Sequence, residues 1–150
     1  MSYYITDMMN NIKDLIEAGS YAISYSVETN FTNYQELKNL TDTKVVIFPH
    51  SATVDRMTRA GDNQHEVRML AAVLKRVIEK PSTDEFMTEI GGLFEFMLNI
   101  VDVLSGQSLE CGAVYKNIEI EQFFDYEYLN SNRAFSGVIA VNYMFARGPG

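Results

Sequence analysis

This sequence lacks the features that mark secreted, disulfide-stabilised or membrane-spanning proteins. It has no tryptophan and a single cysteine, Cys111, so an internal disulfide cannot form and nothing indicates a secreted domain. The N-terminal segment lacks the basic, apolar and small-residue pattern of a secretory signal. No stretch approaches the ~20 apolar residues that a membrane helix needs. We therefore expect a soluble protein that is made in a reducing cytoplasm and does not associate with membranes.

Motifs of the common catalytic and nucleotide-binding sites are also absent. The chain contains no G-x-G-x-x-G, no G-x-x-x-x-G-K-[ST] and no G-x-S-x-G pattern. His50 and His65 lack further ligands at metal-binding spacing, and Cys111 has no histidine near it in the sequence to activate it. Glu119 and Glu121 could pair as an acid and a base, but solvation of a strand surface explains them more simply. We expect no metal, no cofactor and no enzymatic activity.

Charge is distributed unevenly along the chain, whose net charge is −8. Residues 44–80 carry seven basic and four acidic residues, whereas residues 81–132 carry ten acidic residues and one basic residue, Lys116. The acidic balance argues against wrapping of nucleic acid, because phosphates require clustered Lys and Arg. A solvated acidic face is the simplest interpretation. The alternatives are electrostatic matching between neighbouring subunits and an acidic lumen past which DNA slides.

The length and composition are those of one globular domain. The chain has 150 residues, of which 47% are hydrophobic. We expect a single domain over residues 1–150 that buries a core without a metal or a disulfide. Nine tyrosines and nine phenylalanines are many for this length. Aromatic side chains bury a large area each, so they favour a sheet-rich core or a large subunit interface.

Apolar periodicity predicts the first three elements. Apolar residues at three- and four-residue spacing predict an amphipathic helix over 3–18 that ends at Gly19. Period-two alternation over 21–27 predicts a half-buried strand. The apolar run 44–48 predicts a buried strand that ends at Pro49.

The middle of the chain is more polar and its pattern is less regular. Residues 28–43 are typical of a polar connection, and residues 50–64 of an exposed loop that carries Arg56 and Arg59. These two arginines are the candidate site residues. They belong either to a solvated loop or to a loop that orders on contact with the acidic surface of an adjacent subunit or tube protein. Residues 65–78 alternate as a strand does, although a helical period also fits.

A second and longer helix is predicted over residues 83–104. Ser82 and Glu85 match a capping box at its start, and the serine–glycine pair at 105–106 ends it. The glycine pair at 91–92 costs about 1 kcal/mol per residue relative to alanine inside a helix. This cost indicates close packing at 91–92 against a sheet or a neighbouring subunit.

The C-terminal part of the sequence predicts a β-hairpin. Residues 118–128 alternate, residues 130–133 form a polar turn, and residues 135–145 alternate strictly. The predicted fold is therefore α+β. A mostly antiparallel sheet is covered on one face by two long helices, and the chain ends in the hairpin.

The order of these patterns resembles a known family. It contains K-V-V-I-F-P at 44–49, R-M-T-R at 56–59, H-E-V-R-M-L-A-A-V at 65–73 and F-S-G-V-I-A-V-N-Y at 135–143. The chain is similar in this respect to the tail-terminator proteins of long-tailed bacteriophages, also called tail-completion or minor tail proteins. The resemblance covers nearly the whole chain in order and spacing. No single motif is diagnostic, because the motifs are patterns of strands and loops.

The resemblance implies a structural role in the virion. Such proteins form a homohexameric ring that caps the finished tail tube, ends its polymerisation and joins it to head-completion proteins in the phage neck. Double-stranded DNA passes through the ring without sequence-specific binding, and assembly takes place in the cytoplasm of the host bacterium. The family has no catalytic residues to transfer. Its arginine-bearing loop matches residues 51–63, which implies an interface role for Arg56 and Arg59.

Three other functions fit the same residues. The first is another assembly protein of the particle, either a neck or head-closure protein or a tail-tube subunit. The second is a small cytoplasmic enzyme whose site forms between subunits, which requires His50, His65 or Cys111 to meet in a pocket. The third is a ligand-binding domain, which requires a sizeable apolar pocket. Strands that are apolar on both faces, such as 65–78, promote aggregation when they are exposed in a monomer. A closed ring would bury them between subunits.

Overall fold

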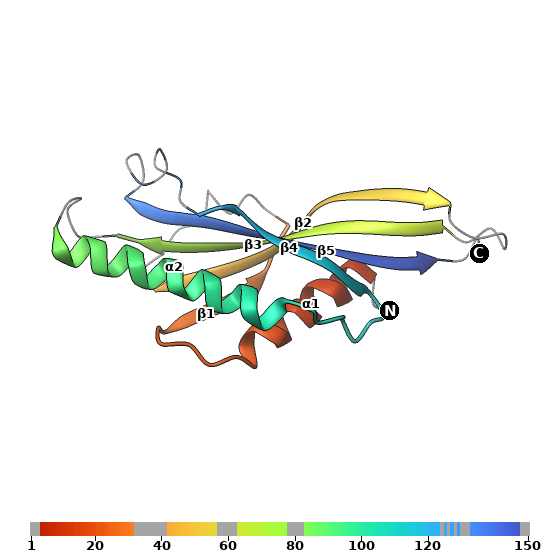
Figure 1. Cartoon of the computed structure of the whole chain (residues 1–150), viewed down its shortest axis with the longest axis horizontal. Coiled ribbons are helices and arrows are strands. Elements are labelled where there is room, and N and C mark those ends of the chain that lie inside the picture. The colour runs from red at the N-terminus through yellow and green to blue at the C-terminus, as the bar shows by residue number, and fades with distance from the viewer. Residues whose placement is uncertain are drawn as a thin grey trace.

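The computed structural model describes residues 4–31, 42–56, 63–77, 83–123, 125, 127, 129 and 133–147. These residues form two helices and five strands (Figure 1). The helices are α1 (Tyr4–Glu17) and α2 (Asp84–Leu104). The strands are β1 (Tyr25–Thr29), β2 (Thr43–Arg56), β3 (Asn63–Arg76), β4 (Val114–Gln122) and β5 (Ala134–Arg147).

The five strands form one sheet in the order β1-β2-β3-β5-β4. β1 is parallel to β2, and every other neighbouring pair is antiparallel. The predicted α+β class and mostly antiparallel sheet are thus confirmed, as is the antiparallel C-terminal strand pair. The sheet is strongly twisted, and β2, β3 and β5 extend together beyond α1 at one end of the molecule (Figure 1).

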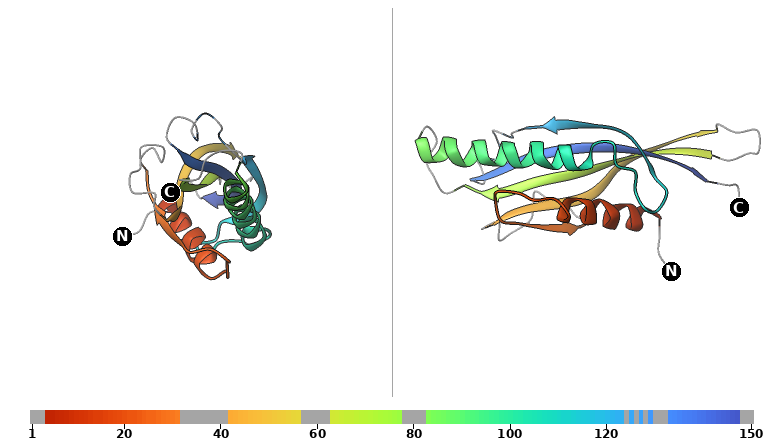
Figure 2. Two further views of the ribbon diagram at one scale, coloured as in Figure 1. Left: turned by 90° about the vertical axis from the view of Figure 1, so that its left-hand side faces the viewer. Right: turned by 60° about the horizontal axis from the view of Figure 1, so that its bottom comes forward.

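Both helices lie on the same side of the sheet (Figures 1 and 2). Their apolar stripes and one sheet face form a single buried cluster, because side chains alternate between the two faces along each strand. The cluster includes Met8, Met9, Ile12 and Ile16 of α1, Leu93, Phe96, Met97 and Ile100 of α2, and Val45, Ile47, Met69, Ala71, Ile139 and Val141 of the sheet. We call this the helix side of the sheet, and the opposite face the helix-free side.

The end of α1 depends on a close approach of Tyr21. The Tyr21 hydroxyl donates a hydrogen bond of 2.8 Å to the carbonyl of Ile16, one of the last carbonyls of the helix. A Cβ atom at Gly19 would lie 2.5 Å from that hydroxyl, so only glycine leaves room for it. The predicted helix is confirmed within one residue at each end. The strand begins later than predicted, at Tyr25, because Tyr21 is used to cap the helix.

β2 continues through Pro49, although the sequence pattern predicts that the strand ends there. The register with β3 places Pro49 opposite Met69 and Ser51 opposite Arg68, so His50 is the extra residue of a bulge. Proline lacks a backbone N–H and is found inside sheets mainly at edges and bulges. The bulge therefore lets the strand absorb a residue that otherwise ends it.

The predicted loop over 50–64 is consequently wrong for most of its length. β2 runs to Arg56, and β3 begins at Asn63. The intervening residues 57–62 lie outside the described part of the chain, as does most of the predicted connection 28–43.

β3 is a strand, as the sequence analysis favoured, and the helical alternative for 65–78 is wrong. It lies between β2 and β5 and is buried on both faces from Met69 to Leu74. This explains why its sequence is nearly continuous in apolar residues at that point.

Thr83, and not Ser82, caps the second helix. The hydroxyl oxygen of Thr83 accepts a hydrogen bond of 3.2 Å from the backbone N–H of Phe86. Ser82 itself lies outside the described residues. The predicted end of the helix is confirmed: Ser105 is the C-cap, and Gly106 follows with a φ of 75°, a left-handed conformation that glycine adopts without strain.

The glycine pair of α2 is not packed against the sheet. A Cβ atom added at Gly91 or Gly92 would have nothing within 4 Å among the described residues. The glycine that does allow close packing is Gly137 of β5, where an added Cβ would lie 2.4 Å from the sulfur of Met97. The prediction of close packing at 91–92 is therefore wrong for the sheet, and it stays a prediction for a neighbouring subunit.

The C-terminal strands differ in extent from the predicted hairpin. β4 begins four residues earlier than the predicted start at 118 and ends at Gln122. Beyond it, the backbone N–H of Leu129 donates to the carbonyl of Asp125 at 3.0 Å, a helical turn where the sequence indicated more strand. Of the predicted polar turn at 130–133, Arg133 alone belongs to the described residues, and it has a positive φ of 50°. β5 is confirmed.

Candidate interaction surface

One of the two candidate arginines, Arg56, lies at the tip of the three extended strands. Arg56 is the last residue of β2, and its backbone pairs with Asn63 of β3, which in turn pairs with Arg147 of β5. Arg59 lies outside the described residues. We call the paired ends of these three strands the arm: Ser51–Arg56 of β2, Asn63–Arg68 of β3 and Asn142–Arg147 of β5. The side chains of Arg56 and Arg147 are not described.

The β2 strand of the arm is exposed on both faces. Four consecutive residues from Ser51 to Val54 are exposed, and 56% of the Val54 surface is accessible to solvent. β1 ends at Thr29 opposite Ile47, so no strand of the described residues covers the outer edge of this stretch. An accessible strand edge offers unpaired backbone groups to another strand, which makes it a natural site for association.

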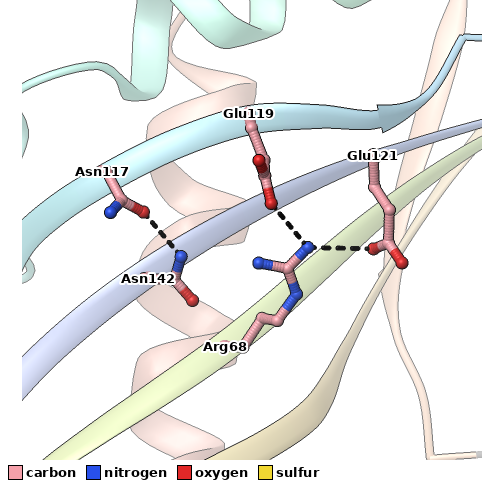
Figure 3. A network of polar contacts seen from close by, with 5 residues as sticks. All are labelled: Arg68, Asn117, Glu119, Glu121 and Asn142. Carbon is pink, nitrogen blue, oxygen red and sulfur yellow. Dashed lines mark hydrogen bonds and ion pairs between the residues drawn. The ribbon is translucent and has the colours of Figure 1, made fainter.

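A network of ion pairs crosses the helix-free side at the base of the arm (Figure 3). The Arg68 guanidinium of β3 contacts Glu119 Oε1 at 2.8 Å and Glu121 Oε2 at 3.3 Å, both on β4. The hydrogen bond to Glu119 raises the pKa of Arg68 further above its ordinary value. The two glutamates do share a strand face, as the sequence predicted, but they act as acceptors for a common cation.

Two further cross-strand contacts extend this network. Lys116 Nζ contacts Glu66 Oε2 at 2.7 Å, and the Asn142 amide donates to Asn117 Oδ1 at 2.6 Å. Both cations of the network, Arg68 and Lys116, therefore already have carboxylate partners. The resulting surface is polar, with three carboxylates against two cations, and it holds no free cation for a phosphate among these residues.

A shallow groove lies between this network and the apolar half of the helix-free side. Its volume is about 460 Å³, and it is lined by Phe48, His50, Leu70, Glu121, Gln122 and Val138. Leu70 and Val138 belong to a second buried apolar cluster that also contains Val46, Ala72, Leu74, Ala134 and Ala140. The groove therefore has an apolar floor and a polar rim.

The residues that an enzymatic function requires do not meet in one pocket. His50 lies at the bulge on the rim of the helix-free groove, whereas His65 stacks on Phe145 with ring centroids 5.0 Å apart. Phe145 also stacks on Tyr4 at 4.1 Å. Burial, and then the adjacent Cys111 thiol, raise the pKa of Tyr4 to about 12. His65 and Cys111 are thus separated by two aromatic rings that pack the base of the arm on α1.

Across the described ranges, no group of three or more His, Cys, Asp or Glu side chains is placed to hold a metal ion. Neither of the two described helices combines the length and apolar character needed to cross a membrane.

Arg68 is a functional candidate of the surface that the sequence patterns do not single out. Arg68 interrupts the apolar run of β3, and a period-two pattern assigns it to the face opposite Val67 and Met69. Glu119 and Glu121 alternate in the same way on β4. The contact between Arg68 and these glutamates could not be predicted because it depends on the strand order. β3 and β4 are separated by β5, and no local pattern reveals that they share a sheet.

No family model matches the chain, and no curated protein matches its sequence.

Proposed function

We propose that this chain is a structural subunit of a long-tailed bacteriophage, a tail terminator. In this proposal it forms a homohexameric ring at the head-proximal end of the tail, ends polymerisation of the tail tube and joins the tail to head-completion proteins. Double-stranded DNA passes through the lumen. The observation that carries the proposal is the arm, whose β2 strand is exposed on both faces from Ser51 to Val54 and has no paired strand on its outer edge among the described residues.

The arm suits assembly because a monomer gains little from it. In its β2 strand, all four side chains from Ser51 to Val54 are exposed and so bury little apolar surface, and exposed strand edges invite pairing with other chains. A subunit interface gives such a strand a partner on its open edge. The resemblance of the element order and spacing to tail terminators supports the same reading.

The charge arrangement is compatible with DNA passing without adhesion. DNA binding requires cations that can approach phosphates, and each phosphate contact contributes to affinity. On the helix-free side, Arg68 and Lys116 are held by glutamates at 2.8 and 2.7 Å. A lumen lined by such a surface offers hydrogen bonds and a slight excess of negative charge, which favours sliding over binding.

The decisive experiment combines particle imaging with a tube-capping assay. The purified chain is expected to form closed six-fold rings with a hole of DNA width by electron microscopy and native mass spectrometry. Added to polymerising tail-tube protein, it is expected to stop growth at one tube end. Copolymerisation along the tube indicates a tube subunit instead, and binding to heads but not to tubes indicates a neck or head-closure protein. A persistent monomer would refute all three assembly roles.

The enzyme alternative has its own test. Alanine variants of His50, His65 and Cys111 are expected to leave ring formation and tube capping unchanged. Loss of a measurable catalytic activity in any of them, with assembly intact, would favour the enzyme.

A further inference from the structure

Within the described residues, two strand segments at opposite sides of the sheet have no strand paired to their outer edge. One is Ser51–Arg56 of β2, which lies beyond the end of β1. The other is on β4, the last strand of the sheet on its far side. Within β4, the N–H of Tyr115 donates to the hydroxyl of Ser108 at 3.2 Å, so the start of the strand already has a partner. The part of β4 with regular pairing to β5 on its inner side is Asn117–Ile120.

Bulges delimit both segments. His50 is the extra residue at the start of the β2 segment, and register shifts at Lys116 and Glu121 flank the β4 segment. Bulges interrupt the regular spacing of backbone hydrogen bonds and so limit how far another strand can pair. Each open edge is therefore short, with defined ends, and this favours one register over indefinite growth.

The two segments match in the polarity of their faces. Ala52 and Val54 lie opposite Val67 and His65, on the helix side, and Thr53 lies on the helix-free side. Directly opposite residues of neighbouring strands share a face.

On β4 the alternation has the same sense. Ile118 and Ile120 contact the helix-side core, whereas Asn117 and Glu119 lie on the helix-free side. Placing the β2 segment beside the β4 segment therefore joins apolar to apolar on one face and polar to polar on the other.

The strand directions also fit a repeating arrangement. From β2 through β3 and β5 to β4, each strand is antiparallel to the one before it. A rotation about a ring axis keeps the direction of each strand relative to that axis. Because the series contains four strands, β2 of the next copy runs antiparallel to β4 of the preceding copy.

We infer that neighbouring copies of this chain pair edge to edge, the Ser51–Arg56 segment of one copy with the Asn117–Ile120 segment of the next. This inference rests on the proposed ring and specifies how the ring is held together. The contact is heterologous, and in the closed ring of the proposed function its repetition extends the sheet continuously around the ring. The helix-free polar network of each copy then continues into Thr53 of its neighbour.

Disulfide trapping tests this contact. In a Cys111→Ala background, Thr53→Cys is combined with Asn117→Cys or with Glu119→Cys, two residues apart on one face, so that either register is sampled. Under oxidation, one of the two pairs is expected to give a covalent ladder that reaches the size of the ring. The matched control combines Ser26→Cys, an exposed position on the edge strand β1, with Glu119→Cys, and is expected to give no ladder.

A lysine substitution tests the same contact without relying on the geometry of a disulfide. Ala52→Lys places an ammonium group where the neighbour's Ile118 and Ile120 would pack, and ring formation is expected to be lost. The control variant Ser26→Lys also replaces a small residue by lysine, but on β1, outside the inferred contact, and is expected to keep the ring. Both positions are exposed, so unchanged thermal unfolding of the monomer checks the fold.

The outcomes separate this inference from the proposed function. Rings that survive Ala52→Lys, or that give no ladder with either cysteine pair, overturn the edge pairing and leave the tail-terminator proposal in place. Absence of rings in the wild-type protein overturns the proposed function and the inference with it. A ladder from Ser26→Cys in place of Thr53→Cys would assign the contact to β1 and overturn the inference as well.

Discussion

Replacement of Gly137 by alanine tests how α2 is packed on the sheet. Gly137 is buried in β5 beneath α2, and an added Cβ would lie 2.4 Å from the sulfur and 2.7 Å from the terminal methyl of Met97. It would also lie 3.1 Å from the backbone carbonyl oxygen of Phe123. The end of a methionine side chain is flexible, but Met97 is fully buried and has little room to move.

The expected cost is that of overpacking a close-packed core. Inserting a methyl group that forces neighbours to shift costs about 1–3 kcal/mol. For a domain of this size, each 1 kcal/mol lowers Tm by roughly 2–4 °C, so a decrease of roughly 2–12 °C is expected. Urea unfolding gives the free energy of unfolding, and differential scanning calorimetry gives Tm. A shortened partner, Met97→Ala, is expected to be destabilising alone but to recover part of the cost when combined with Gly137→Ala.

Gly91→Ala is the matched control, since it makes the same chemical change in α2. An added Cβ there meets nothing within 4 Å among the described residues, and alanine is favoured over glycine in a helix by about 1 kcal/mol. The monomer is therefore expected to become more stable. If Gly137→Ala were neutral or stabilising, the close packing of Met97 against β5 would be refuted. If Gly91→Ala stabilised the monomer but weakened the ring, the glycine pair would belong to a subunit contact.

Three further predictions follow from individual contacts. Thr83→Ala is expected to cost about 1 kcal/mol in urea unfolding through loss of the helix cap, whereas Ser82→Ala is expected to cost much less. Arg68→Leu is expected to cost about 1 kcal/mol or less, with a smaller loss in about 1 M salt, because its glutamate partners are solvent-exposed. Burial raises the pKa of Tyr21 to about 12, so its contribution to stability is complete below pH ~10 and is lost as the pH rises toward 12. The pH dependence of unfolding in this range is therefore expected to be shallower for Tyr21→Phe than for the wild type.

The regular elements could be predicted because their patterns are local. The stripe of α1 and the period-two alternation of β5 each fit one element type over many residues. The sequence of β3 fits both the period of two of a strand and the period of 3.6 of a helix. The strand was the correct choice because apolar residues on both faces suit the middle of a sheet, and β3 is buried from Met69 to Leu74.

The bulge and the network could not be predicted because they depend on partners distant in sequence. Pro49 is usually a strand breaker, and only the register with β3 reveals that His50 is absorbed as a bulge. For this reason the sequence pattern predicts a loop where the β2 strand of the arm lies. The pairing of Arg68 with Glu119 needs β5 between their strands, and strand order has no local signature.

The β2 strand of the arm is held by fewer apolar contacts than the first half of the same strand. Val45 and Ile47 of β2 are completely buried between helices and sheet, whereas Ser51–Val54 of the same strand are exposed. Local opening costs less where few apolar contacts are broken. In the monomer, amides of the arm are therefore expected to exchange with deuterium faster than those of Val45 and Ile47.

Ring formation is expected to slow amide exchange in Ser51–Arg56 and to leave that of Val45 and Ile47 unchanged. If the outer edge of Ser51–Arg56 pairs with β4 of a neighbour, the amides that face this edge gain partners, and their exchange slows when rings form. Val45 and Ile47 are already protected and serve as the internal reference. Equal exchange of the Ser51–Arg56 amides in monomer and ring would refute the edge contact, because a strand that acquires hydrogen-bonded neighbours cannot retain the opening free energy of an exposed one.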